Sequence, residues 1–246
     1  MKKLYAKNEV LFAVVWILVY CLALTPIRAK LGDTSPWMTL ALLLLSSAAF
    51  LFIRSSRLTE KYGLNGWPKN TKRFLFFLPM WILATGNLWG GIAPQYSGMQ
   101  QVFAVCSMIL VGFAEEVIFR GFLFRALLKE NSTVSAVVIS ALTFAIGHII
   151  NLFTGQATLE TLVQIAFAAG WGFIFTMVTY KSGSLLPAIL AHAMIDVFSV
   201  FCSSDSETLS LIYSGLTVAV SVCWCIFLAK QPQNQPENSG QQGDCR

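Results

Sequence analysis

The feature that most constrains this chain is the length of its uncharged apolar runs. No Asp, Glu, Lys or Arg occurs from Phe74 to Ala114. Only roughly 20 helical residues are needed to cross a hydrocarbon core about 30 Å thick. The composition agrees, because 56% of the residues are hydrophobic and 12% are charged, with a mean hydropathy of +0.65, whereas soluble domains carry about 25% charged residues. We therefore predict an all-α, polytopic integral membrane protein.

Charges and turn signals divide the chain into eight predicted transmembrane helices. The uncharged stretch after Phe74 is too long for one span, so we divide it at the turn-forming sequence GGIAPQYSG. The predicted spans are residues 10–27, 36–53, 74–92, 101–128, 134–151, 160–180, 184–200 and 208–229. They fall into N-terminal helices (1–99), a core (100–200) and a last helix (201–230), followed by a polar tail (231–246) whose composition predicts disorder.

The distribution of basic residues predicts the orientation. Lys and Arg concentrate on the cytoplasmic side of membrane proteins, and with the N-terminus inside only Arg28 and Lys30 of the 17 basic residues fall on the other side. We expect a multi-pass protein of the cell membrane with both termini cytoplasmic and the first span retained rather than cleaved. The net charge of +5 is then explained by contact with anionic headgroups, and no basic–aromatic pattern indicates nucleic acid.

Three acidic residues and both histidines of the chain lie well inside the predicted spans, where a charged side chain costs roughly 2.5 to 3.5 kcal/mol. They are Glu115, Glu116, His148, His192 and Asp196. Groups that are costly one by one are best explained as members of one polar site. We therefore predict that these side chains converge.

Spacing indicates how they pair. Glu116 and Arg120 are one helical turn apart and can form an ion pair, whereas Glu115 is rotated by about 100° and is left free. His192 and Asp196 also share one face, so Asp196 can accept a hydrogen bond from one imidazole nitrogen and fix the tautomer that the other presents.

The register between spans places Glu115 opposite His148. The sequence KENST, residues 129–133, predicts the turn of an antiparallel hairpin, and both residues then lie about 24 Å from that turn. His192 lies only about 12 Å from its own turn near Ser184. Convergence requires that the hairpin project by about 10 Å or tilt strongly. We predict the projection, which puts the site about 12 Å below the cytoplasmic face.

A carboxylate beside imidazoles in a wet membrane cavity is suited to activating water. Glu115 can act as general base, His148 can hold the water or a metal, and His192 can donate to the oxyanion. Neither Gly-x-Ser-x-Gly nor His-Glu-x-x-His occurs, so the serine-hydrolase and zincin patterns are not indicated.

Three motifs resemble those of the CAAX-processing and bacteriocin-processing intramembrane proteases, also called the Abi family, which are relatives of the type II CAAX prenyl endopeptidases. They are EEVIFRG, FAIGH and GSLLPAILAHAMID, which occur in this order on three spans. The resemblance implies that Glu115 is the catalytic base, that Glu116 and Arg120 support the site, and that His148, His192 and Asp196 bind the water, the oxyanion or a metal. Many relatives have Asn where this chain has Asp196, which cannot donate when ionised and so favours a divalent metal, with zinc expected, bound by Glu115, His148, His192 and Asp196.

The function predicted from these features is that of an intramembrane endopeptidase. Its substrate would be a peptide or membrane protein, in CAAX-type processing, bacteriocin or peptide processing, or immunity. Two alternatives stay open: a non-catalytic membrane scaffold that sequesters a partner protein, and a proton-coupled transporter. The sequence predicts neither the substrate's identity nor the oligomeric state.

Overall fold

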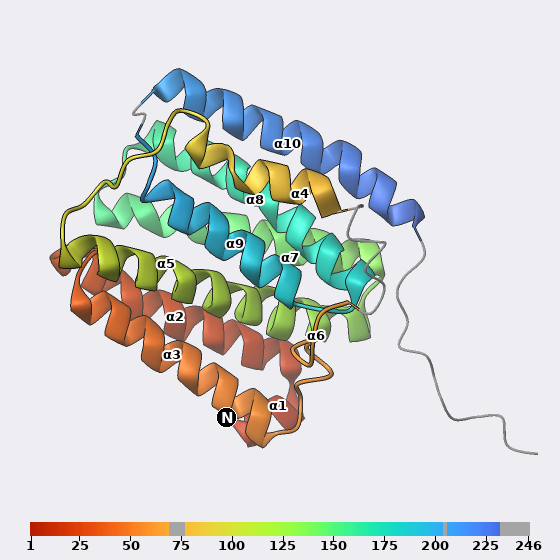
Figure 1. The fold of residues 1–246 in the computed structure, drawn as a ribbon. Coiled ribbons are helices and arrows are strands. Elements are labelled where there is room, and N and C mark those ends of the chain that lie inside the picture. The colour runs from red at the N-terminus through yellow and green to blue at the C-terminus, as the bar shows by residue number, and fades with distance from the viewer. Residues whose placement is uncertain (69–76, 204–205, 232–246) are drawn as a thin grey trace, which may run out of the picture.

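The structure is a computed structural model that describes residues 1–68, 77–203 and 206–231. Within these ranges the chain is a bundle of helices (Figure 1). The α-helices are α1 (Lys2–Lys7), α2 (Glu9–Leu31), α3 (Pro36–Ser55), α4 (Leu78–Ala84), α5 (Met99–Glu116), α6 (Phe124–Glu130), α7 (Thr133–Gly147), α8 (Thr158–Ser182), α9 (Leu186–Ser199) and α10 (Glu207–Lys230). The described chain also contains the 3₁₀ helices η2 (Gly86–Leu88) and η4 (His148–Thr154) and the π-helix η3 (Val117–Leu123).

Six helical segments of the described chain are long and apolar enough to cross a membrane. They are Glu9–Leu31, Pro36–Ser55, Met99–Glu130, Thr133–Thr154, Thr158–Ser182 and Glu207–Lys230. Large apolar side chains such as Leu22, Leu44 and Leu51 are exposed on their outer faces, as expected for contact with lipid. The predicted all-α, polytopic membrane fold is confirmed.

The predicted count of eight spans is not reproduced. In the third predicted span, 74–92, the helix α4 covers only seven residues, and residues 74–76 lie outside the described ranges. The seventh, 184–200, corresponds to α9, which has 14 residues and is shorter than a full crossing requires. Most of the predicted tail, residues 232–246, also lies outside the described ranges.

Local sequence signals set the helix ends that frame the bundle. Ser35 caps α3 and is followed by Pro36 at the first helical position, where a missing N–H costs little. Ser132 and Ser206 cap α7 and α10 through their side chains. Gly183 ends α8 in the left-handed conformation, which glycine adopts without steric cost.

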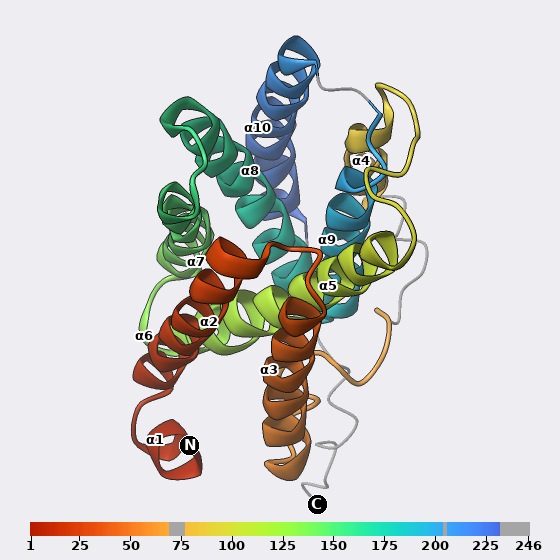
Figure 2. The same ribbon diagram turned by 90° about the vertical axis from the view of Figure 1, so that its left-hand side faces the viewer.

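The helix α5 lies at the centre of the bundle, between α3 and α9 (Figures 1 and 2). Its contact with α9 is close because of Gly112: a Cβ there would lie 2.7 Å from the Ala193 backbone nitrogen. The continuation of α5 through η3 packs against α2 by aromatic contacts, with the ring centroids of Phe12 and Phe122 5.0 Å apart. These two contacts bring three elements together near the middle of the molecule.

Several connections meet at one end of the bundle. Lys61, after α3, and Lys129, at the end of α6, both donate to the carboxylate of Glu9 at the start of α2, with N–O distances of 2.6 Å. The backbone N–H of Leu185, in the α8–α9 turn, donates to Gly63 at 2.9 Å. We call this end, defined by Glu9, Lys61, Lys129 and the α8–α9 turn, the basic end.

Candidate functional site

The overlong predicted fourth span is one continuous helical segment, Met99–Glu130, with a π-helix inside it. Every residue of η3 is buried. A π-helical turn takes up extra residues and is frequent at functional sites. Glu115 and Glu116 are the last two residues of α5, and Arg120 lies in η3, so the motif EEVIFRG spans the change of helix type.

Glu116 and Arg120 form the predicted ion pair. The Arg120 Nη1 donates to Glu116 Oε1 at 2.7 Å, and both side chains are fully buried. The guanidinium also lies over the ring of Phe144, 4.2 Å from its centroid, an arrangement that stabilises a desolvated cation. The prediction of this pair is confirmed.

Glu116 has a second partner that spacing did not predict. Its Oε1 also accepts a hydrogen bond from His192 Nδ1 at 2.8 Å, and the imidazole stacks on the ring of Phe175 with centroids 5.3 Å apart. The Glu116 carboxylate thus fixes the imidazole of His192. No pattern within one helix could indicate this contact, because it depends on the register between α5 and α9.

Asp196 does not have the orienting role expected for it. Its Oδ2 lies 3.5 Å from His192 Nε2, which is too long for a good hydrogen bond, whereas Glu116 binds Nδ1. The prediction that Asp196 fixes the tautomer of His192 is therefore wrong in this structure. Asp196 instead lies beside the imidazole nitrogen that is left exposed to the cavity.

The position of Glu115 on the helix predicted a free carboxylate, but in the structure this carboxylate is hydrogen-bonded. Its Oε1 accepts a hydrogen bond from the Tyr20 hydroxyl at 2.9 Å, and its Oε2 lies 3.8 Å from His192 Nε2. Tyr20 belongs to α2, far from the motifs in sequence. An apolar span with one tyrosine carries no signal that marks this residue, because interfacial aromatic residues are common in membrane helices.

His148 lies at the junction of α7 and η4. Its Nδ1 lies 3.2 Å from the carbonyl oxygen of Phe144. Because a carbonyl only accepts, Nδ1 carries the proton, and in the neutral ring Nε2 is an acceptor. His148 therefore presents a lone pair rather than an N–H group.

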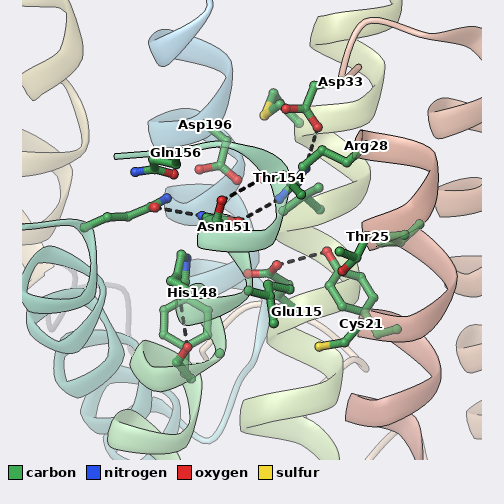
Figure 3. Close-up of a pocket in the computed structure, with 18 of the residues that line it drawn as sticks. Cys21, Thr25, Arg28, Asp33, Glu115, His148, Asn151, Thr154, Gln156 and Asp196 are labelled. Carbon is green, nitrogen blue, oxygen red and sulfur yellow. Dashed lines mark hydrogen bonds and ion pairs between the residues drawn. The ribbon is translucent and has the colours of Figure 1, made fainter. Parts of the chain in front are cut away.

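The predicted residues meet in one cavity of about 340 Å³. Figure 3 shows Glu115, His148 and Asp196 directed into it, with Tyr20, His192 and Phe144 also in its lining. Glu116 and Arg120 support it from behind, since they do not line the cavity. The predicted convergence of these side chains is therefore observed.

The other end of the cavity is polar and was not predicted. Arg28 Nε donates to Asp33 at 2.7 Å and Arg28 Nη1 to Asn151 at 3.3 Å, and Asn151 donates to Gln164 at 2.7 Å (Figure 3). This chain joins α2, η4 and α8. The sequence feature that could have indicated this polar end is Arg28. It is one of the two basic residues that the predicted orientation places on the non-cytoplasmic side.

The contacts at the two turns do not favour the predicted 10 Å projection of the hairpin. Thr133, just after the α6–α7 turn, lies 3.4 Å from the hydroxyl of Tyr180, which precedes the α8–α9 turn. The two turns thus lie next to each other. Figure 2 shows α5 strongly inclined to α3 and α10, and this tilt accounts for the convergence.

Two of the four predicted metal ligands make other contacts. Among the residues that the structure describes, no group of three or more His, Cys, Asp or Glu side chains could hold a metal ion. Of the four predicted ligands, His192 uses Nδ1 for Glu116 and Glu115 uses Oε1 for Tyr20. The predicted zinc site stays a prediction.

The fold and the cavity define a multi-pass membrane protein with a buried carboxylate–imidazole site. Residues 98–198 match the family model described as Type II CAAX prenyl endopeptidase Rce1-like, and no curated protein matches the chain. The resemblance expected from the three motifs is confirmed over this segment, which runs from just before α5 to the end of α9. The matched segment includes all six predicted site residues but neither Tyr20 nor Arg28.

Proposed function

We propose that this protein is an intramembrane endopeptidase that hydrolyses a peptide bond with a water molecule activated by Glu115. One observation carries the proposal: Glu115, His148, His192 and Asp196, from three separate helical segments, line a single cavity. A carboxylate in a cavity that two imidazoles also line can accept a proton from water and return it to a leaving group.

The two histidines have different roles in this proposal. His148 presents the Nε2 lone pair, because its Nδ1 is bound to the Phe144 carbonyl, and it can accept a hydrogen bond from the attacking water. His192 donates Nδ1–H to Glu116, so its Nε2 donates only in the imidazolium form. The carboxylates of Glu115, Glu116 and Asp196 around the ring favour that form.

The reaction follows from these assignments. Glu115 takes a proton from the water, and the oxygen of the water forms a bond to the carbonyl carbon of the substrate. The carbonyl oxygen becomes an oxyanion, to which His192 Nε2–H donates. Glu115 then gives its proton to the amide nitrogen, the C–N bond breaks, and a carboxylic acid and an amine leave. Neither a covalent enzyme intermediate nor a redox partner is needed.

We extend the CAAX type of substrate to this chain as part of the proposal, because the description of the matched family names a prenyl endopeptidase. The test uses the purified protein with two fluorescent peptides that end in a CAAX sequence, one farnesylated and one not. Cleavage is followed by mass spectrometry of both products. Processing of the farnesylated peptide alone would support a prenylated substrate.

The decisive variant is Glu115→Gln, which keeps the shape of the side chain but removes the base. We expect cleavage to fall by about 10²- to 10⁴-fold. Glu130→Gln is the matched control, since Glu130 is exposed at the far end of the same helical segment. If no peptide is cleaved by the wild type, peptide termini in membranes with and without active protein identify the substrate. A biological effect that survives Glu115→Gln would instead favour the sequestering scaffold.

The predicted metal has a test of its own. Metal content of the purified wild type is compared with that of His148→Ala, and activity is measured after dialysis against a chelator and after return of zinc. Stoichiometric zinc that disappears in His148→Ala would support the metal. Full activity with no bound metal would contradict it.

A further inference from the structure

We propose that Tyr20 of α2 is a positioning residue for Glu115. The Tyr20 hydroxyl holds Oε1 of Glu115, so that Oε2 is the oxygen that contacts the water. This inference rests on the proposed function, in which Glu115 is the base. It assigns a role in the reaction to a helix outside the segment that matches the peptidase family.

The contacts of the two carboxylate oxygens differ. Oε1 accepts from the Tyr20 hydroxyl at 2.9 Å, and because a carboxylate only accepts, the phenol is the donor. Oε2 lies 3.8 Å from His192 Nε2, which is beyond hydrogen-bond distance. The two atoms therefore do not bind each other, and a reacting group can approach both. The geometry therefore distinguishes a held oxygen from a reactive one.

Glu115 depends on this contact for its orientation. Among the residues that the structure describes, the Tyr20 hydroxyl makes the one hydrogen bond to this carboxylate. A glutamate side chain otherwise has three rotatable bonds, and fixing them is what a catalytic base requires. Loss of the phenol oxygen would free the carboxylate to turn away from His192.

Tyr20 is itself held rigidly. Its side chain is only 7% exposed, and α2 is fixed against η3 by the contacts of Phe12 and Trp16 with Phe122, with centroid distances of 5.0 and 5.7 Å. The hydroxyl is thus supplied by a packed helix rather than by a mobile loop. Residues 98–198 alone would contain the base without the group that orients it.

The test compares Tyr20→Phe with Tyr213→Phe. Tyr213 is a matched control: its side chain is 5% exposed, and its hydroxyl donates to the Leu83 carbonyl at 2.7 Å, outside the cavity lining. Each variant loses one buried phenol hydroxyl, so a general cost to folding affects both. We expect Tyr20→Phe to lower kcat by about 10- to 100-fold with KM nearly unchanged, and Tyr213→Phe to leave both near wild type.

A second measurement does not require turnover. The carboxylate stretching band of Glu115, identified in the infrared spectrum by its loss in Glu115→Gln, reports the hydrogen bond directly. We expect this band to move in Tyr20→Phe and to stay in place in Tyr213→Phe.

The outcomes separate this inference from the proposed function. If Glu115→Gln is inactive while Tyr20→Phe keeps the wild-type kcat and an unmoved band, Tyr20 does not position the base. An equal loss of kcat in both tyrosine variants, or loss of folded protein in Tyr20→Phe alone, would also overturn the inference, because the role would then be structural. A fully active Glu115→Gln would overturn the proposed function itself.

Discussion

The fully buried pair of Glu116 and Arg120 is the residue-scale feature on which the site depends. Glu116 Oε1 accepts from both Arg120 and His192, so one carboxylate neutralises a cation and fixes an imidazole. Removing one partner of a buried ion pair leaves the other charge uncompensated, which is far more costly than replacing both partners by apolar residues. Glu116 thus affects both stability and chemistry.

These two effects can be separated by substitution. Glu116→Gln is expected to destabilise the fold by about 3 to 5 kcal/mol, because it strands the Arg120 guanidinium. The double variant Glu116→Gln with Arg120→Met removes both charges and is expected to recover most of that stability. Unfolding in detergent by denaturant measures both, with activity assayed in parallel.

Activity should not return with stability. In the double variant His192 still lacks the carboxylate that fixes its ring, so we expect hydrolysis to stay low. Recovery of activity together with stability would show that Glu116 acts only through Arg120, and that its contact with His192 is incidental.

Residue identities and spacings within one helix predicted part of this site. The positions of Glu115, Glu116, His148, His192 and Asp196 in apolar spans identified them as candidates, because ionisable residues are costly in the hydrocarbon core and those that occur there are mostly functional. The Glu116–Arg120 pair followed from helical periodicity. Helical periodicity did not predict which glutamate binds His192, because the angle between α5 and α9 decides which of the two adjacent glutamates faces the imidazole.

At the scale of secondary-structure elements, the close approach of α5 and α9 sets the distance between Glu115 and His192. Gly112 permits this approach, since a Cβ there would lie 2.7 Å from the nitrogen and 2.9 Å from the Cα of Ala193. Both of these are backbone atoms, which cannot move aside without shifting the helix. Even one methyl group must therefore separate the two helices.

Gly112→Ala should lower activity and destabilise the protein by about 1 to 3 kcal/mol through overpacking. Gly215→Ala in α10 is the matched control, because a Cβ there has open space around it and alanine favours a helix by about 1 kcal/mol over glycine. Thermal unfolding and the peptide assay are compared for both. Equal behaviour of the two variants would mean that the α5–α9 contact does not set the geometry of the site.

The helices themselves were more predictable than their lengths. Six predicted spans, beginning near residues 10, 36, 101, 134, 160 and 208, correspond to the six long helical segments of the described chain, because hydropathy alone determines them. The π-helix η3 was not predicted. An overlong span was the available signal, but its physical origin, an altered hydrogen-bond register around a buried Arg120, depends on tertiary packing.

For the whole molecule, the structure separates the basic end from the mouth of the cavity. The helix α2 runs from Glu9, at the basic end, to Arg28, at the polar end of the cavity, a distance of roughly 30 Å by helical rise. Exposure grows in the same direction: the side chain of Glu115 is 15% exposed, whereas those of Arg28 and Asp33 are 30% and 39% exposed. The cavity therefore opens toward Arg28, away from the basic end.

This arrangement changes what the predicted orientation implies. If the basic end is cytoplasmic, as the distribution of Lys and Arg predicts, water reaches the cavity from the opposite face. The cleavage site would then be close to the outer surface of the cell membrane. Both the orientation and the direction of opening can be tested with one reagent.

Native Cys21 lines the cavity beside Tyr20 and serves as a reporter of access. In a variant whose other cysteines are replaced by serine, we expect a membrane-impermeant thiol reagent to label Cys21 in intact cells. In a background without native cysteines, Lys129→Cys at the basic end should be labelled only after permeabilisation, whereas Gln156→Cys at the cavity mouth should be labelled without it. Labelling of Lys129→Cys alone in intact cells would reverse the orientation of the protein, and labelling of Gln156→Cys without Cys21 would show that the cavity does not open toward Arg28.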